Sequence, residues 1–375
     1  MWPYWLIFSL PAGVALLAHR RKAITAARPQ SVKLNGVWVL VFLAMTVFIG
    51  CRFEVGADWD NYLHYINDSD APATDPGYEL LNWASMKLDL GMLGVNLIGG
   101  AIFSVGLAVF CCSLPRPWLA LAASVPYLVI VVAMGYSRQG MALGCEMLGL
   151  VALGRNSILW FVLWVLLGAT FHKSAILLLP IAALAAVRRR LWMGVCVLIV
   201  TYGAYELLLR SSVDFLYYNY VEEEYESDGA LVRLLMNAVP AAILLIARRR
   251  FQFAEAEMRL WLWFAAISIA LLGFLFLTPA TAAVDRLALY MLPLQLAVFA
   301  HLPDVFGVQR TRDRAPIAPT AANSGARRST TISENELIKV AVLLYYGAVQ
   351  FAWLNYATHA WAWVPYRFYP MEYWF

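Results

Sequence analysis

The chain has 375 residues, of which 62% are hydrophobic and only 14% are charged, and its mean hydropathy is +0.65. A water-soluble domain of this size needs more charge to cover its surface. The net charge of +4 does not indicate nucleic-acid binding. None of the five cysteines belongs to a Cys-x-x-Cys pair, which argues against a disulfide framework and a zinc site. The composition therefore predicts an integral membrane protein.

Apolar runs recur along the whole chain, and a helix needs roughly 17–25 residues to cross a bilayer. The first run precedes its basic residues, which is the reverse of a signal peptide, so we expect it to be a spanning helix. We predict an all-α, polytopic fold with about twelve helices, near residues 2–18, 36–51, 92–112, 119–134, 140–153, 157–171, 174–187, 191–209, 231–247, 259–277, 287–302 and 337–356.

The basic residues predict the orientation of these helices, because Arg and Lys concentrate in short cytoplasmic loops. Every second loop is basic, whereas the loops at residues 52–90 and 210–230 are acidic and are expected outside. Both termini then lie outside. Residues 1–302 form the predicted transmembrane core, 303–336 a disordered basic cytoplasmic loop, and 337–375 the last helix with an aromatic external tail.

Two of the predicted hairpins have polar turns at residues 135–139 and 172–173. Their arms have roughly 14–16 residues, or about 21–24 Å, whereas the hydrocarbon core is about 30 Å thick. Either the arms are longer than these bounds, or the turns lie below the outer surface. Recessed polar turns are tolerated only where protein or water surrounds them. We therefore expect a water-filled cavity that opens outward.

Several cationic side chains lie at the predicted outer ends of helices, where the positive-inside rule should deplete them. They are Arg52, Arg138, His172, Lys173, Arg210 and Arg286. An arginine at membrane depth costs at least a few kcal/mol unless it is paired or solvated. A shared anionic ligand explains such a group, because guanidinium binds phosphate in a bidentate fork. Anchoring to lipid headgroups is the alternative.

Four short motifs occur in a characteristic order. They are Arg52-x-x-x-Gly56-x-Asp58-x-x-x-Tyr62, Arg138-Gln139, Phe171-His172-Lys173-Ser174-Ala175 and Asp285-Arg286-Leu287-Ala288-Leu289-Tyr290. A further stretch, Asp75-Pro76-Gly77-Tyr78-Glu79, is similar to an "EPGYE" element with Asp in place of Glu. In a multispan chain with a basic linker, these motifs resemble the EpsG family of bacterial exopolysaccharide polymerases, related to the Wzy-type O-antigen polymerases. The resemblance covers about residues 1–300.

The resemblance implies an enzyme of the bacterial inner membrane with periplasmic termini. Such an enzyme joins oligosaccharide repeat units carried on undecaprenyl diphosphate, and transfers the growing chain to a hydroxyl of the incoming unit. Neither a nucleotide sugar nor a cofactor is implied. The expected partners are this lipid-linked oligosaccharide and the lipid bilayer, without nucleic acid. A chain-length regulator is left open as a further partner.

The candidate site residues follow from that chemistry, in which negative charge grows on the leaving diphosphate. We assign stabilisation of this charge to Arg138 and Arg286, with Arg52 close by. His172 is the candidate for activating or orienting the acceptor hydroxyl, and Asp58 is the competing base. A structural salt bridge between Arg52 and Asp58 is the alternative for that pair. Further contacts to diphosphate or sugar are expected from Tyr62, Gln139, Lys173 and Tyr290.

Other interpretations remain for several of these features. Asp58-Trp59-Asp60 looks like a metal-binding Asp-x-Asp element, but only Asp58 matches the family motif, so we predict no metal. An O-antigen-ligase-like transferase would be expected to have a larger late external loop than the one at 210–230. A flippase would place charges along the whole membrane path. The aromatic tail, residues 353–375, favours an interfacial belt over a sugar-stacking surface.

Overall fold

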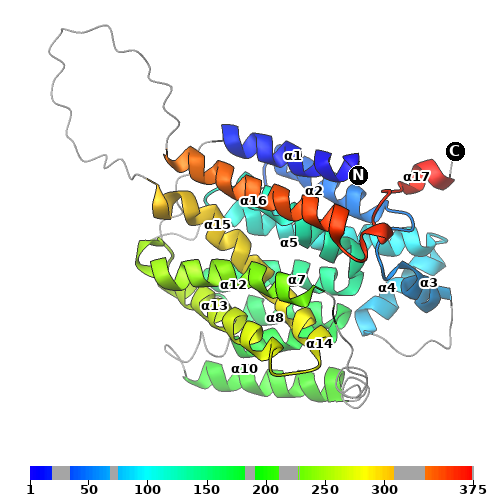
Figure 1. Cartoon of the computed structure of the whole chain (residues 1–375). Helices are drawn as coiled ribbons and strands as arrows, with labels where there is room; N and C mark the ends of the chain where they lie inside the picture. The colour runs from blue at the N-terminus through cyan, green and yellow to red at the C-terminus, as the bar shows by residue number, and fades with distance from the viewer. Residues whose placement is uncertain are drawn as a thin grey trace, which may run out of the picture.

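The computed structural model describes residues 1–18, 34–67, 75–181, 191–210, 227, 229–307 and 334–373. Throughout these ranges the chain forms a helical bundle without a β-strand, and the one isolated β-bridge there joins Arg52 to Phe368 (Figure 1). The predicted all-α fold is therefore confirmed.

Five helical stretches of the described chain are long and apolar enough to cross a membrane. They are α5 (Gly91–Ser113), α12 with η6 (Ala230–Arg250), α13 (Glu255–Leu275), the continuous α14–η7–α15 (Thr281–Phe306) and α16 (Glu334–Tyr356). Shorter apolar helices are α1 (Trp2–Leu17), α2 (Gly36–Gly50), α6 (Pro117–Ser124) with η1 (Val125–Ala133), α8 (Ile158–Phe171) and α10 (Leu191–Ala204) with η3 (Tyr205–Leu209). These helices support a membrane protein, whereas twelve spans and an outward cavity stay predictions.

Three boundaries differ from the expected ones in ways that affect the site. Helix α7 spans Ser137–Gly154, so Arg138 and Gln139 lie in its first turn rather than in a connecting turn. Helix α14 (Thr281–Ala288) begins six residues before the apolar run, so Arg286 is held within a helix. The polar region 52–90 is also largely helical, because it contains α3 (Trp59–Asn67) and α4 (Pro76–Lys87).

Helices extend into both ends of the loop expected at 303–336, because α15 (Leu292–Phe306) continues past Pro303 and α16 begins at Glu334. Residues 308–333, which include Ser333 of the expected capping box, lie outside the described residues. The same holds for most of the loop at 210–230 and for much of the seventh predicted helix.

The two ends of the bundle differ in what they carry. The N-terminus, the C-terminal end of α16 and helices α3, α4 and α17 (Tyr369–Tyr373) lie at one end, and the C-terminal end of α15 and the start of α16 lie at the other (Figure 1). Near the latter end, Arg116 pairs with Asp304 of α15 through a contact of 2.7 Å. The motif residues described next gather at the end formed by α3 and α4.

Candidate functional site

The centre of the site is the carboxylate of Asp75, which precedes α4. Pro76 occupies the first turn of that helix, a position that suits its fixed backbone angle, and the Asp75 side chain makes no capping hydrogen bond. Instead, Asp75 Oδ2 accepts a hydrogen bond from Arg138 Nη1 at 3.1 Å, and Oδ1 accepts one from the backbone N–H of Lys173 at 3.0 Å. His172 Nδ1 lies 3.8 Å from Oδ2. One buried carboxylate thus joins α4, α7 and the turn after α8.

The glycine of the Asp75–Glu79 motif allows this approach of α4 to α8. A Cβ added to Gly77 would lie 2.4 Å from the hydroxyl oxygen of Thr170, near the end of α8. No real Cβ tolerates that distance. The motif therefore needs glycine here to bring Asp75 against the His172 turn.

Arg138 is held by aromatic rings as well as by Asp75. Its guanidinium carbon lies 5.4 Å from the ring centroid of Tyr65 and 5.9 Å from that of Tyr78, distances typical of cation–π contacts. The Tyr62 hydroxyl is hydrogen-bonded to the Arg138 backbone. The Arg138 side chain keeps 25% exposure, so a fixed cation remains open to a ligand.

Arg286 reaches the same region from α14. Its guanidinium carbon lies 4.1 Å above the ring of Tyr136, the residue just before α7. The backbone carbonyl of Arg286 accepts a hydrogen bond of 2.7 Å from Gln139 Nε2. Tyr290, in η7 (Leu289–Met291), bonds through its hydroxyl to Ser174 Oγ at 3.0 Å. Gln139 and Tyr290 are both buried, which places them behind the site as links between its elements.

The charges of both guanidinium groups act on Asp58 and His172. Burial raises the pKa of Asp58, and Arg286 and Arg138 both act against that rise, while Asn61 hydrogen-bonds to the carboxyl. Burial lowers the pKa of His172, Asp75 opposes the change, and the same two arginines add to it. The His172 imidazole is consequently neutral at neutral pH and can accept a proton. Two cations, a base and a carboxylate therefore share one site.

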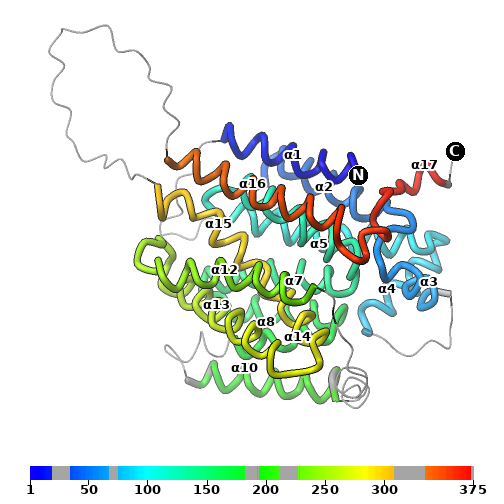
Figure 2. Tube along the Cα trace, viewed as in Figure 1, coloured from blue at the N-terminus to red at the C-terminus, as the bar shows by residue number. Residues whose placement is uncertain are grey.

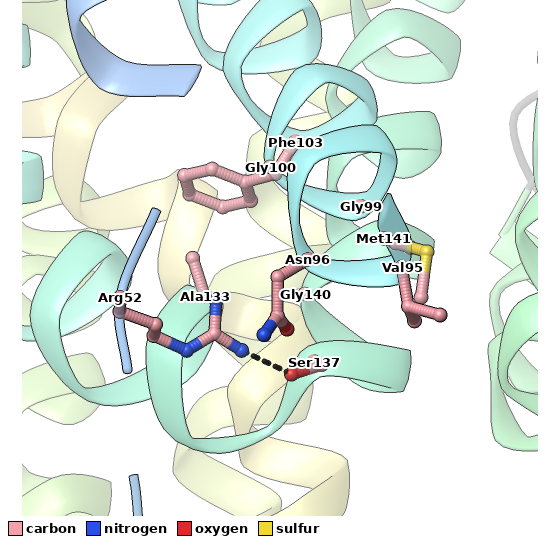
Figure 3. Close-up of a pocket in the computed structure, with 10 residues that line it drawn as sticks. All are labelled: Arg52, Val95, Asn96, Gly99, Gly100, Phe103, Ala133, Ser137, Gly140 and Met141. Atoms are coloured by element: carbon pink, nitrogen blue, oxygen red, sulfur yellow. Dashed lines mark hydrogen bonds between the residues drawn. The ribbon is translucent and has the colours of Figure 1, made fainter. Parts of the chain in front are cut away.

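Arg52 is hydrogen-bonded to the start of α7 and does not form the salt bridge with Asp58. Its Nη1 donates to the Ile49 carbonyl at 2.5 Å, Nη2 to Ser137 Oγ at 2.6 Å and Nε to the Val55 carbonyl at 3.2 Å. Burial lowers its pKa to about 10. The side chain lines a cavity of about 10 Å³, room for about one water, together with the amide of Asn96 (Figure 3). Arg52 thus fixes its loop to the start of α7.

The C-terminal tail also supports the site, which the sequence did not predict. The chain turns back after α16 to lie beside the end of α2 (Figure 2). Backbone hydrogen bonds join Gly56 N–H to the Ala362 carbonyl at 2.8 Å and Tyr369 N–H to the Cys51 carbonyl at 2.7 Å. Trp363 is buried and donates to the Ile130 carbonyl at 2.6 Å. The expected interfacial belt is therefore wrong for Trp363.

Two further residues were missed by the sequence argument. Asp75 was recognised as part of a motif, but its acidic side chain was attributed to an external loop. Arg233, on α12 (Ala230–Ala247), pairs with Asp285 and was overlooked, although an arginine within an apolar run is itself a signal. By contrast, Arg210 is 70% exposed and pairs with Glu206, four residues earlier. It does not belong to the group formed by Asp75, Arg138, His172 and Arg286, which we call the cluster.

The Asp58-Trp59-Asp60 element resembles a metal-binding motif. Among the residues that the structure describes, no group of three or more His, Cys, Asp or Glu side chains is placed to hold a metal ion. The second acid of the Asp-x-Asp element, Asp60, is solvent-exposed on α3.

Comparison with known proteins supports the resemblance found in the motifs. No curated protein and no solved structure matches the chain. The model of the EpsG family matches residues 36–311, a segment that includes Asp75, Arg138, His172 and Arg286 but neither α1 nor the tail. Because that match covers most of the 375 residues and every motif that meets in the cluster, the chain belongs to the EpsG family.

Proposed function

We propose that the protein joins oligosaccharide repeat units carried on undecaprenyl diphosphate into exopolysaccharide, at the outer face of the inner membrane. Membership of the EpsG family supports an exopolysaccharide polymerase-like role, and the apolar helices support a membrane location. The observation that carries the proposal is that two arginines from different helices meet at the start of α7: Arg138 lies in its first turn, and Arg286 of α14 lies 4.1 Å above the ring of Tyr136, which precedes it.

The two arginines suit the donor half of the reaction. When the glycosidic bond to the carrier breaks, its electron pair leaves with the diphosphate, whose negative charge grows. Cations that are already fixed in place stabilise such a transition state without a cost of reorganisation. Arg138 is fixed by Asp75 and Arg286 by the ring of Tyr136, so neither needs to be ordered when substrate arrives.

His172 suits the acceptor half. Its Nδ1 faces Asp75, which leaves Nε2 to take the proton of the acceptor hydroxyl as that oxygen attacks the anomeric carbon. The resulting imidazolium is stabilised by the Asp75 carboxylate. Asp58 is the competing base, because burial raises its pKa and the same arginines face it.

The test is the polymer made by cells that depend on the Arg138→Lys or Arg286→Lys variant. Lysine keeps the charge but loses the planar fork of donors. We expect loss of long polymer and accumulation of single repeat units on the outer leaflet. The matched control is Arg210→Lys, an exposed arginine outside the cluster, which should leave polymer length unchanged.

Two outcomes contradict the proposal. Polymer of normal length from both cluster variants removes the arginines from the reaction. Repeat units that accumulate on the cytoplasmic leaflet instead indicate a flippase.

A further inference from the structure

An ion pair outside the cluster joins α12 to α14. Arg233 Nε lies 2.7 Å from Asp285 Oδ1, and Arg233 Nη2 lies 2.8 Å from Oδ2, so the contact is bidentate. The two side chains are only 11% and 5% exposed. This geometry matches the planar fork of a guanidinium to both oxygens of a carboxylate.

Ser227 extends the ion pair to a third segment. Its hydroxyl donates to Asp285 Oδ2 at 3.0 Å and accepts from Arg233 Nη2, while its backbone N–H donates to Thr281 Oγ1 at 2.9 Å. Thr281 is the first residue of α14. We call Ser227, Arg233 and Asp285 the α14 clamp. It holds the start and the middle of a helix of only eight residues.

A second row of contacts fixes the other end of α14. Asn237, one turn after Arg233 on α12, donates from Nδ2 to the Ala288 carbonyl at 2.7 Å. From the opposite side, Gln139 of α7 donates to the Arg286 carbonyl. Helix α14 is thus held from two neighbours and cannot rotate about its axis without breaking these bonds.

Asp285 and Arg286 are neighbours in the chain, so their side chains leave α14 about 100° apart. Because Asp285 is fixed against α12, the direction of Arg286 is fixed as well, toward the ring of Tyr136. A bidentate ion pair also fixes the geometry of the two side chains that form it.

We propose that Arg233 is a positioning residue that, through Asp285, sets the orientation of Arg286 in the diphosphate site. The role in binding rests on the proposed function, whereas the clamp itself stands on its own geometry. Arg233 does not touch substrate in this scheme. Its effect on ligand binding must therefore pass entirely through Arg286.

The test measures the Kd of undecaprenyl diphosphate for the purified full-length protein in nanodiscs. Arg233→Lys keeps a charge but cannot bridge both carboxylate oxygens, and we expect roughly 5-fold weaker binding. In the Arg286→Lys background the same change should cost nothing further, because coupled residues are not additive. Arg259→Lys, which alters a distant ion pair with Glu255, is the matched control and should bind like the wild type.

A second variant guards against misfolding, because removing one member of a buried pair leaves an uncompensated charge. Arg233→Asp and Asp285→Arg singly should each weaken binding by about 10-fold or more. Together they restore an ion pair of reversed polarity and should recover binding to within about 3-fold of the wild type.

Three results overturn the positioning role. The first is a folded Arg233→Lys protein that binds like the wild type, and the second is a loss of affinity that multiplies with that of Arg286→Lys. The third is a reversed pair that binds no better than Arg233→Asp. An Arg286→Lys protein that binds as tightly as the wild type overturns the proposed function instead. The two failures are therefore distinguishable.

Discussion

Replacing Asp75 by asparagine removes one charge from the centre of the site and keeps its shape. The carboxylate serves Arg138 and the backbone N–H of Lys173 and faces His172. Asparagine has a single acceptor oxygen, so it can satisfy only one of these donors, and its amide group then faces another donor. The change therefore acts on the leaving-group cation and on the base at once.

The structure sets the size of the expected effect. Asp75 is 5% exposed and Arg138 is 25% exposed, so their hydrogen bond is screened only in part. Hydrogen bonds to charged groups contribute about 1.5–3 kcal/mol. General acid–base catalysis contributes about 10²- to 10⁴-fold. We expect Asp75→Asn to lower the polymerisation rate about 100-fold, which corresponds to about 2.7 kcal/mol in the barrier.

The pH dependence gives this prediction a signature. Asp75 raises the pKa of His172 against the larger lowering by burial. Without that carboxylate the pKa of His172 falls further below its usual 6.5, so the imidazole stays neutral to lower pH. The acidic limb of the rate profile should then move to lower pH while the plateau falls.

The assay is the initial rate of polymer formation from a synthetic lipid-linked repeat unit, with the purified protein in nanodiscs at a series of pH values. Asp89→Asn, a change in the turn after α4 and outside the cluster, is the control. A wild-type rate, or an acidic limb that does not move, refutes the role assigned to Asp75.

Three further predictions concern the base and the scaffold. If His172 is the base, the acidic limb of the rate profile lies below pH 6.5 and His172→Gln should abolish it. If Asp58 is the base, the limb lies above pH 3.8 and Asp58→Asn should abolish it, so the rate profiles of the two variants decide. Trp363→Ala should cost about 3–5 kcal/mol of unfolding free energy, while the exposed Trp361→Ala should cost little, as thermal melting will show. Gly77→Ala places a Cβ 2.4 Å from a hydroxyl on α8, so it should displace α4 and lower the polymerisation rate. A polymerisation rate equal to that of the wild type contradicts this.

The length of the apolar runs predicted most of the helices closely. The expected run 92–112 is α5 (Gly91–Ser113), and the run 231–247 is α12. These predictions succeed because lipid and core both demand unbroken apolar helices. Polar helix starts were missed, as in α7 and α14, because hydropathy reports burial in lipid and not the hydrogen bonding of the backbone.

The motifs predicted which residues matter more readily than how they act. Arg138, Arg286 and His172 were singled out because basic side chains are unexpected at the predicted outer ends of helices. The structure places Arg138 and His172 around Asp75 and Arg286 against Tyr136. The contacts of Asp75 were not predictable, since an acid before Pro76 is an ordinary helix start. The Arg233–Asp285 pair joins positions 52 residues apart, and no local pattern specifies such a pairing.

The most direct test of the account is a cryo-EM structure of the protein in a nanodisc with undecaprenyl diphosphate. The account predicts one diphosphate whose oxygens lie within hydrogen-bond distance of both Arg138 and Arg286. A diphosphate bound elsewhere, or held by only one of the two guanidinium groups, contradicts it.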